Sequence, residues 1–453
     1  MATYLPPSDR AGSDDTYLIG RGPAWFAFAM TLALMLFDYI DRQVIVSLFP
    51  YMKADWGLSD KRLGALVSVV SVTVALGALP VALVADRASR VKSIVVMATA
   101  WSLATISCMF TRNYGQLLAA RAVVGLGEAG YGSVGAALIA SVFPARMRGA
   151  LLAAFFAAAS VGSVLGVLVG GLIAAHWGWK AAFGVVGFPG LVLALLYLKV
   201  RDYKTVALTP ALNEATRSTG STVAFVAKSL VKSRTMLWVC LGGAAQLIVV
   251  SSVWSWLPSF LNRFHDLPPD QAAVRAAMVV LVGAVGSVFW GNMVDRAGSR
   301  RPRLKLFVMA AICVAAMLVL LPTFGATGSA SLTNSSQFAL IALGGFLMTC
   351  SVGPVSAIVI DVIHPGVRAT GASVLALFQN LFGLAAGPFL VGVLSDSFGL
   401  ETAMTVIPVF GALAAVFFLL ASRSYEGDKQ RVAEVRLDAE AVATAHATPA
   451  AAR

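Results

Sequence analysis

The segment at residues 291–301 reads Gly-Asn-Met-Val-Asp-Arg-Ala-Gly-Ser-Arg-Arg, and a shorter relative, Asp-Arg-Ala-Ser-Arg-Val-Lys, occupies residues 86–92. In both segments an aspartate directly precedes an arginine, and the two aspartates, Asp86 and Asp295, are 209 residues apart. Each segment lies between two long apolar stretches, at the same place in its half of the chain. The repetition predicts two similar halves built from the same succession of helices.

The composition places the chain in a lipid bilayer. Of its 453 residues, 58% are apolar and 12% are charged, and the mean hydropathy is +0.81, whereas soluble proteins carry about 25% charged residues. A bilayer is spanned by about 20 largely apolar residues, and twelve stretches of the chain, six in each half, reach this length. We therefore expect an all-α polytopic membrane protein. The expected segments are an N-terminal tail (1–23), a six-helix bundle (24–200), a linker (201–235), a second six-helix bundle (236–422) and a C-terminal tail (423–453).

The distribution of positive charge sets the expected orientation. The formal net charge of +12 would point to nucleic acid in a soluble domain. If both termini are cytoplasmic, 25 of the 34 Lys and Arg residues fall in cytoplasmic segments, seven in outer loops and two within spans. This asymmetry follows the positive-inside rule. We therefore expect both termini in the cytoplasm and no nucleic-acid partner.

The doubled segment resembles the signature of the major facilitator superfamily, Gly-x-x-x-Asp-Arg-x-Gly-x-Arg-Arg, in the place where that family carries it. The second copy matches fully, whereas Ala82 and Ser89 replace the two glycines of the first. The resemblance covers about residues 24–422. It implies the major facilitator fold, with inverted three-helix repeats in each bundle, and a monomeric secondary transporter that works by alternating access rather than an enzyme.

The fourth span narrows this resemblance. Residues 121–131 read Arg-Ala-Val-Val-Gly-Leu-Gly-Glu-Ala-Gly-Tyr, which matches the superfamily pattern Arg-x-x-x-Gly-x-Gly-x-Ala, with Glu128 as its unusual member. Followed to Pro144, the stretch resembles the Spinster branch, transporters of lysolipids and sphingosine phosphates whose bacterial members lie in the cell (inner) membrane. The segment Asp-Tyr-Ile-Asp-Arg at residues 38–42 fits this branch and also resembles acid–proton symporters of the superfamily.

Five ionisable side chains lie within spans of the first half. Such groups cost about 2.5–3.5 kcal/mol each to insert and usually face partners or a cavity. Three carboxylates against two guanidiniums leave one carboxylate without a fixed partner, and burial disfavours its charged form, so it can exchange protons near neutral pH. We expect Asp41 and Glu128 to couple transport to the proton gradient, which replaces any cofactor. Asp38, Arg42 and Arg121 complete the charge network that receives the substrate.

The spans of the second half differ from those of the first in the side chains that they could present to a substrate. No Lys or Arg lies at mid-membrane depth between residues 236 and 422, and the polar side chains there are uncharged and stand among aromatic ones. This contrast favours an amphiphilic substrate, with its charged head group at the first bundle and its acyl tail at the second. The cavity candidates are Tyr131, Gln246, Trp254, Phe346, Gln379, Asn380 and Phe382.

The doubled segment itself is expected to act as a conformational latch. A carboxylate at a tight cytoplasmic turn can cap a neighbouring helix and meet the positive end of its dipole, and an arginine can pair across the loop. Such contacts hold while the two bundles touch on the cytoplasmic side, so they favour the outward-open state. The latch candidates are Asp86, Arg87, Arg90, Asp295, Arg296 and Arg300.

Two other transport functions stay open: a proton symporter of small organic acids such as hexuronates, and a drug exporter of broad specificity. The symporter would need more cationic or polar residues than the second half contains, whereas the exporter would use the aromatic wall and a carboxylate. An intramembrane hydrolase would need a Ser/His constellation or facing Asp motifs, and a channel would need pore loops. The sequence shows neither. The four cysteines are scattered singly, so we expect buried thiols and no metal site.

Overall fold

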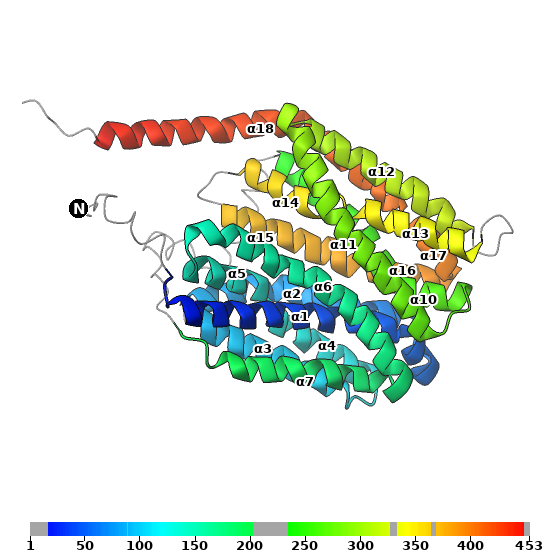
Figure 1. Ribbon diagram of the computed structural model, residues 1–453. Helices are drawn as coiled ribbons and strands as arrows, with labels where there is room; N and C mark the ends of the chain where they lie inside the picture. Colours follow the sequence, from blue (N-terminus) through cyan, green and yellow to red (C-terminus); the bar gives the residue numbers. More distant parts are fainter. Residues whose placement is uncertain (1–16, 88, 203–233, 327–332, 364–367, 448–453) are drawn as a thin grey trace, which may run out of the picture. The chain divides into compact units, whose positions relative to one another are not determined.

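The computed structural model describes residues 17–87, 89–202, 234–326, 333–363 and 368–447. Within these residues, twelve helical segments are long and apolar enough to cross a bilayer (Figure 1). Eight of the segments are single helices, and the other four consist of two or three consecutive elements. The prediction of twelve transmembrane helices is confirmed.

The first compact unit, unit 1, comprises the described parts of residues 1–207, 254–281 and 388–400. It also holds the C-terminal part of α10 (Arg234–Phe264), the N-terminal part of α11 (Pro269–Arg300) and most of α16 (Ala386–Phe398). Its complete helices are α1 (Arg21–Trp56), α2 (Asp60–Arg87), α3 (Arg90–Cys108), α4 (Tyr114–Glu128), α5 (Tyr131–Val142), α6 (Ala145–Trp177) and α7 (Trp179–Tyr197).

The second compact unit, unit 2, comprises the described parts of residues 208–253, 282–387 and 401–453. It contains the remaining parts of α10 and α11 and a π-helical turn, η3 (Gln379–Ala385). Its other helices are α12 (Leu304–Gly325), α13 (Asn334–Met348), α14 (Val352–Asp361), α15 (Arg368–Phe378), α17 (Leu400–Val406) and α18 (Val409–Ala447).

The two units do not coincide with the two halves of the sequence. Unit 1 contains the described helices of the first half together with the ends of three spans from the second half. Those ends belong to α10, α11 and α16, and contacts around Asp60, described below, attach two of them to α2. The division of the chain at the linker 201–235 stays a prediction, because most of the linker lies outside the described residues.

Helix α6 carries glycines four residues apart, a spacing that lets helices approach closely. A Cβ atom on Gly162, Gly166 or Gly170 would meet a backbone carbonyl oxygen of α1. The backbones of α1 and α6 are therefore in contact along residues 36–44 of α1, the part that carries the charged segment 38–42. The glycines thus fix the distance of this segment from its neighbour.

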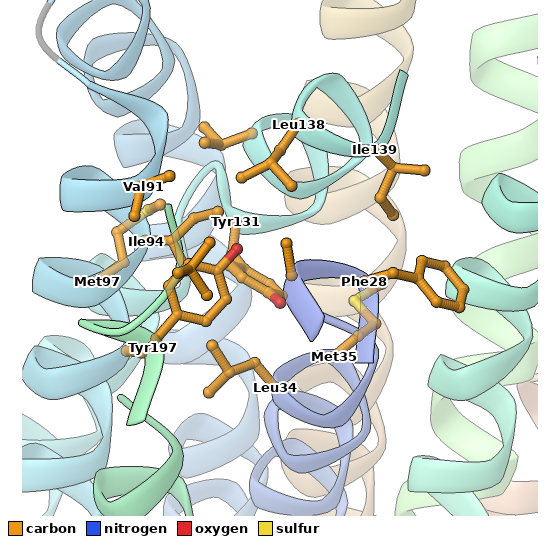
Figure 2. Close-up of a cluster of buried hydrophobic side chains, with 14 of the residues drawn as sticks. Phe28, Leu34, Met35, Val91, Ile94, Met97, Tyr131, Leu138, Ile139 and Tyr197 are labelled. Atoms are coloured by element: carbon orange, nitrogen blue, oxygen red, sulfur yellow. The ribbon is translucent and has the colours of Figure 1, made fainter. Parts of the chain in front are cut away.

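A buried apolar cluster surrounds the N-terminal half of α1, with Tyr131 and Tyr197 among its side chains (Figure 2). The Tyr131 hydroxyl donates a hydrogen bond to the carbonyl oxygen of Thr31 at 2.6 Å, and the hydroxyls of Thr31 and Tyr197 are 2.8 Å apart. Each buried tyrosine hydroxyl therefore has a polar partner, as burial requires. These bonds hold α5 and α7 against α1.

We predict opposite effects for the same substitution at two glycines of α6. A Cβ at Gly166 would press on the Ile40 carbonyl, whereas a Cβ at Gly149 would meet no atom within 4 Å. Gly166→Ala should lower the free energy of unfolding by about 1–3 kcal/mol through overpacking. Gly149→Ala should leave it unchanged or raise it by up to about 1 kcal/mol through helix propensity. Denaturant unfolding in detergent measures both, and equal effects would contradict the close contact.

Candidate functional site

The five charged side chains expected within the first half lie together in unit 1, where α1 and α4 supply all of them. Arg121 Nη1 lies 3.1 Å from Asp41 Oδ1, which makes the first ion pair. Arg42 Nε lies 3.0 Å from Glu128 Oε2 and 3.5 Å from Asp38 Oδ2, which makes two more. The three carboxylate residues and Arg121 are at most 3% exposed, whereas the Arg42 side chain is 18% exposed. The sequence-predicted network is therefore a single cluster.

The pair between Arg121 and Asp41 is the more completely bonded part of the cluster. The Thr105 hydroxyl donates a hydrogen bond to the second oxygen of the Asp41 carboxylate. Arg121 Nη1 also lies 3.4 Å from the Asp41 backbone carbonyl. Because a buried ion pair is stabilised when its remaining lone pairs are also bonded, the partners of Asp41 on two helices, Thr105 on α3 and Arg121 on α4, stabilise this pair.

Arg42 is shared between two carboxylates, and neither is fully bonded. Glu128 lies close to Arg42, yet neither of its oxygens accepts a directed hydrogen bond from the described residues, and the same holds for Asp38 Oδ1. The guanidinium also lies over the Tyr39 ring, 5.4 Å from its centroid. One positive charge therefore faces two negative ones, and both carboxylates have fewer polar partners than Asp41. The assignment of proton coupling to Asp41 and Glu128 stays a prediction.

A break in the fourth span positions Glu128. Helix α4 ends at Glu128, and α5 begins at Tyr131 after Gly130, whose φ of +82° lies in the left-handed region. Glycine adopts this conformation without the strain that a side chain would cause. The break lets the Tyr131 side chain enter the apolar cluster, where it is 1% exposed. Tyr131 thus lies in the core of unit 1.

Two glycines of the fourth span bring α4 against its neighbours. A Cβ on Gly125 would collide with Val70 and Thr73 of α2, and a Cβ on Gly127 would collide with the backbone of Trp101 in α3. Both glycines belong to the Gly-x-Gly pattern that precedes Glu128. The pattern is therefore a packing requirement, and it sets how closely Arg121 and Glu128 approach the rest of the cluster.

The cavity candidates of the second half differ in exposure and bonding. Gln246 is fully buried, and its amide donates a hydrogen bond of 2.8 Å to the carbonyl of Met348, the last residue of α13. It therefore caps the C-terminus of this helix. Trp254 is half-buried, and its indole N–H has no hydrogen-bond partner among the described residues. Three side chains, those of Phe346, Gln379 and Asn380, are half-buried, and Phe382 is 50% exposed.

The latch candidates make contacts inside their own units. In unit 1, Arg90 donates to the Ser141 hydroxyl at 2.8 Å and to the Ala137 carbonyl at 3.3 Å. In unit 2, Asp295 forms an ion pair of 3.0 Å with Lys305. Arg296 is exposed. The side chains of Asp86, Arg87 and Arg300 lie outside the described residues, so the latch stays a prediction.

The structure explains the glycine of the second signature segment and its replacement in the first. A Cβ on Gly298 would collide with the aliphatic part of Lys305, the partner of Asp295. In the first segment Ser89 takes this place, caps α3 by accepting a hydrogen bond from the Lys92 N–H at 3.2 Å, and donates to Asp202 at 2.8 Å. The two copies therefore stabilise their loops by different contacts.

A polar cluster around Asp60, the first residue of α2, has no counterpart among the predicted site residues. The Asp60 carboxylate contacts Lys53 Nζ at 2.7 Å, the Arg263 guanidinium at 2.6 and 2.8 Å, and the Ser395 hydroxyl at 2.5 Å. The Asp396 carboxylate accepts from the N–H groups of Asp60 and Lys61 at 2.8 and 3.0 Å, which caps α2 from α16. All these residues belong to unit 1.

The Asp60 cluster joins parts of the chain that are far apart in sequence, so no local sequence motif predicts it. Its sequence signal is limited to charged residues at the ends of spans, where charges are ordinary. Glycines mark the same contact, because a Cβ on Gly64 would meet Pro388 and a Cβ on Gly392 would meet Asp60. The beginning of α2 and the end of α16 are thus in backbone contact.

Comparison with known proteins identifies relatives along the whole chain. The family model of the Major Facilitator Superfamily matches residues 31–386. Protein spinster homolog 3 of Danio rerio is 27% identical over 467 aligned positions, which cover 95% of this chain and 91% of the relative. The gallate transporter of Pseudomonas putida is also 27% identical, over 86% of this chain and 91% of its own length.

A solved structure shares the fold. It is the crystal structure of a bacterial homolog to the human lysosomal transporter Spinster, in an inward-facing and unoccupied conformation. The TM-score is 0.79 at 22% sequence identity, over 90% of this chain and 99% of the other. This agreement confirms the expected all-α fold with twelve spans.

We predict that two neutralising substitutions in the charged cluster differ in their effect on stability. Asp41→Asn leaves the buried Arg121 without its charged partner and should lower the free energy of unfolding by about 3–5 kcal/mol. Glu128→Gln should lower it less, because Arg42 is partly exposed and retains Asp38. Denaturant unfolding in detergent compares the two variants. A larger loss in Glu128→Gln would contradict the pairing described here.

We also predict that Asp60→Asn separates α2 from α16. The amide cannot balance the charges of Lys53 and Arg263, so the ends of the two helices should part more often. Spin labels at Arg62 on α2 and Ser397 on α16, both exposed residues of unit 1, should show a broader and longer distance distribution than in the parent chain. Ser397→Ala, outside the Asp60 contacts, serves as the unlabelled control for stability. An unchanged distribution would show that the cluster does not hold these ends together.

Proposed function

Because the chain belongs to the Major Facilitator Superfamily, we propose that it is a proton-coupled carrier of an amphiphilic, lipid-like anion or zwitterion, such as a lysophospholipid or a sphingosine-phosphate-like molecule. It is a multi-pass membrane transporter and not an enzyme. We place it in the cell (inner) membrane with both termini in the cytoplasm, working as a monomer by alternating access. The likeness to Spinster proteins supports this substrate class.

The observation that carries the proposal is the sharing of Arg42 between Asp38 and Glu128. Arg42 is the most exposed member of the cluster, so it is the group that an anionic head group reaches first. A phosphate binds a guanidinium through strong charge-assisted hydrogen bonds, and it would compete with both carboxylates. The displaced carboxylate, left in a low-dielectric site, would take up a proton. Substrate binding and proton uptake would then be coupled through one side chain.

The opposite step follows from the same competition. When the substrate leaves Arg42, the guanidinium attracts the carboxylates again, and the negative form of the carboxylate becomes favourable, so the proton is released. In this proposal Arg121 takes no part in the exchange, because it is already paired with Asp41. Its role is to hold α4 against α1. The expected contact of the acyl tail with Trp254, Phe346 and Phe382 rests on the sequence and remains part of the proposal.

A second candidate is a proton symporter of small organic acids. The relatives named a gallate transporter and a probable 4-methylmuconolactone transporter favour it. A carboxylate substrate would compete for Arg42 in the same way as a phosphate. The two candidates differ in whether an acyl chain is needed for binding. A drug exporter of broad specificity, which would use a carboxylate to hold a cation, would not need Arg42.

We predict that a pH gradient drives lysophospholipid uptake into liposomes that contain the protein. Glu128→Gln should abolish the dependence on the gradient, because an amide cannot bind and release the proton. The matched control is Glu401→Gln, the same change in the first turn of α17 in unit 2, which should retain the wild-type response. A fluorescent lysophospholipid and a radiolabelled hexuronate are compared under the same gradient.

The outcomes separate the candidates. Uptake of hexuronate but not of lysophospholipid would establish the organic-acid symporter in place of the lipid carrier. Lysophospholipid uptake that ignores the gradient, or a Glu128→Gln variant with the wild-type response, would overturn the proton coupling.

A further inference from the structure

Two cysteines that are far apart in the sequence lie together in unit 2. The Sγ atoms of Cys313, on α12, and Cys350, between α13 and α14, are 3.7 Å apart. Both side chains are fully buried, and all four cysteines of the chain are free thiols. The transport mechanism proposed above uses neither of these two side chains.

Cys350 occupies the break in the fourth span of the second half. Helix α13 ends at Met348 and α14 begins at Val352, and the Cys350 N–H bonds to the Leu347 carbonyl at 3.2 Å, as in a tight turn. A helix is broken where its regular backbone bonds are replaced in this way. The residues between the two helices therefore form the place where this span can bend.

Side chains add to the backbone bonds that hold the break together. Gln246 donates to the Met348 carbonyl at 2.8 Å. The Thr349 hydroxyl lies 2.9 Å from the Gly283 carbonyl and 3.2 Å from the Phe346 carbonyl, and the Trp290 indole donates to the same Phe346 carbonyl at 2.9 Å. These bonds come from α10 and α11, so the bend can change only when they rearrange.

Cys313 is part of a continuous helix on the other side of the pair. Helix α12 runs for 22 residues and packs against α13. A disulfide requires the two sulfurs to approach to about 2.05 Å, and the separation of 3.7 Å already places them in direct contact. A bond between these sulfurs would join the rigid α12 to the bend.

We propose that Cys313 and Cys350 form a thiol–disulfide switch that fixes the bend of the fourth span of unit 2. A small neutral oxidant such as hydrogen peroxide converts one thiol to a sulfenic acid, and the peroxide O–O bond breaks with release of one water molecule. The second thiol attacks this sulfur, which forms the S–S bond and releases a second water molecule. Together the two thiols lose two electrons and two protons.

The burial of the pair sets when the switch reacts. The thiolate is the reactive form of cysteine, and an apolar core disfavours a charged group. Oxidation therefore requires an opening of the break that admits water and oxidant, and the disulfide then prevents further opening. Cross-linking itself does not depend on the proposed function, whereas its effect on transport rests on it.

The test uses the full chain in liposomes, treated with hydrogen peroxide, quenched with an alkylating reagent and digested without reductant. Mass spectrometry should find a peptide bridged between residues 313 and 350 in the parent chain and in the Cys108→Ser/Cys240→Ser double variant. The single variants Cys313→Ser and Cys350→Ser should lack it. Hydrogen exchange of backbone amides 347–355 should slow in the cross-linked protein. Transport should fall in proportion to the cross-linked fraction, and dithiothreitol should restore both.

Two results would overturn the proposal. One is a parent chain whose four thiols all remain open to alkylation after peroxide and unfolding. The other is a bridged peptide with unchanged hydrogen exchange, since the bond would then not restrain the bend. The exchange measurement compares oxidised and reduced protein of the same sequence, so it stands even if a serine variant folds poorly. Absence of transport in untreated protein would count against the proposed function and leave the cysteine pair unaffected.

Discussion

Two guanidinium groups must neutralise three carboxylates inside one helical bundle, and much of unit 1 is arranged around this imbalance. Charges far from water are stable only when they are paired and hydrogen-bonded. Asp41 meets this condition through its ion pair with Arg121 and its hydrogen bond from Thr105. Arg42 cannot do the same for Asp38 and Glu128 together. The first pair therefore holds α1, α3 and α4 together. Under the proposed mechanism, the second group is the one that exchanges a proton when substrate binds.

Close helix contact makes this arrangement possible. Glycines of α6 place its backbone against α1, and glycines of α4 bring that helix onto α2 and α3. The charged side chains thus reach one another over the length of an ion pair. The fourth span of each half is broken near its middle, at Gly130 in the first half and at Cys350 in the second. In the first half the break follows Glu128 directly, whereas in the second half a set of neutral side chains satisfies the freed carbonyl groups.

The Asp60 cluster shows a different use of charge. Its members lie at helix ends, with Asp60 itself buried, and Asp396 adds a cap from α16 to the one that Ser59 provides within the sequence of α2. In the cluster of α1 and α4, under the proposed mechanism, a proton or a substrate replaces one of the partners of Arg42.

The sequence by itself determined the membrane setting, the number of spans, the family resemblance and the identity of the five charged residues. These properties are local: hydropathy over about 20 residues marks a span, and a charge inside a span is visible without any neighbour. The tertiary structure alone decided which charges pair, because the separation of Arg121 from Asp41 depends on how glycines set the approach of α4 and α1. It also decided that Gln246 closes a broken helix and that Tyr131 lies in the core. For the same reason the Asp60 cluster and the Cys313–Cys350 pair, whose members lie far apart along the chain, became visible only in the folded protein.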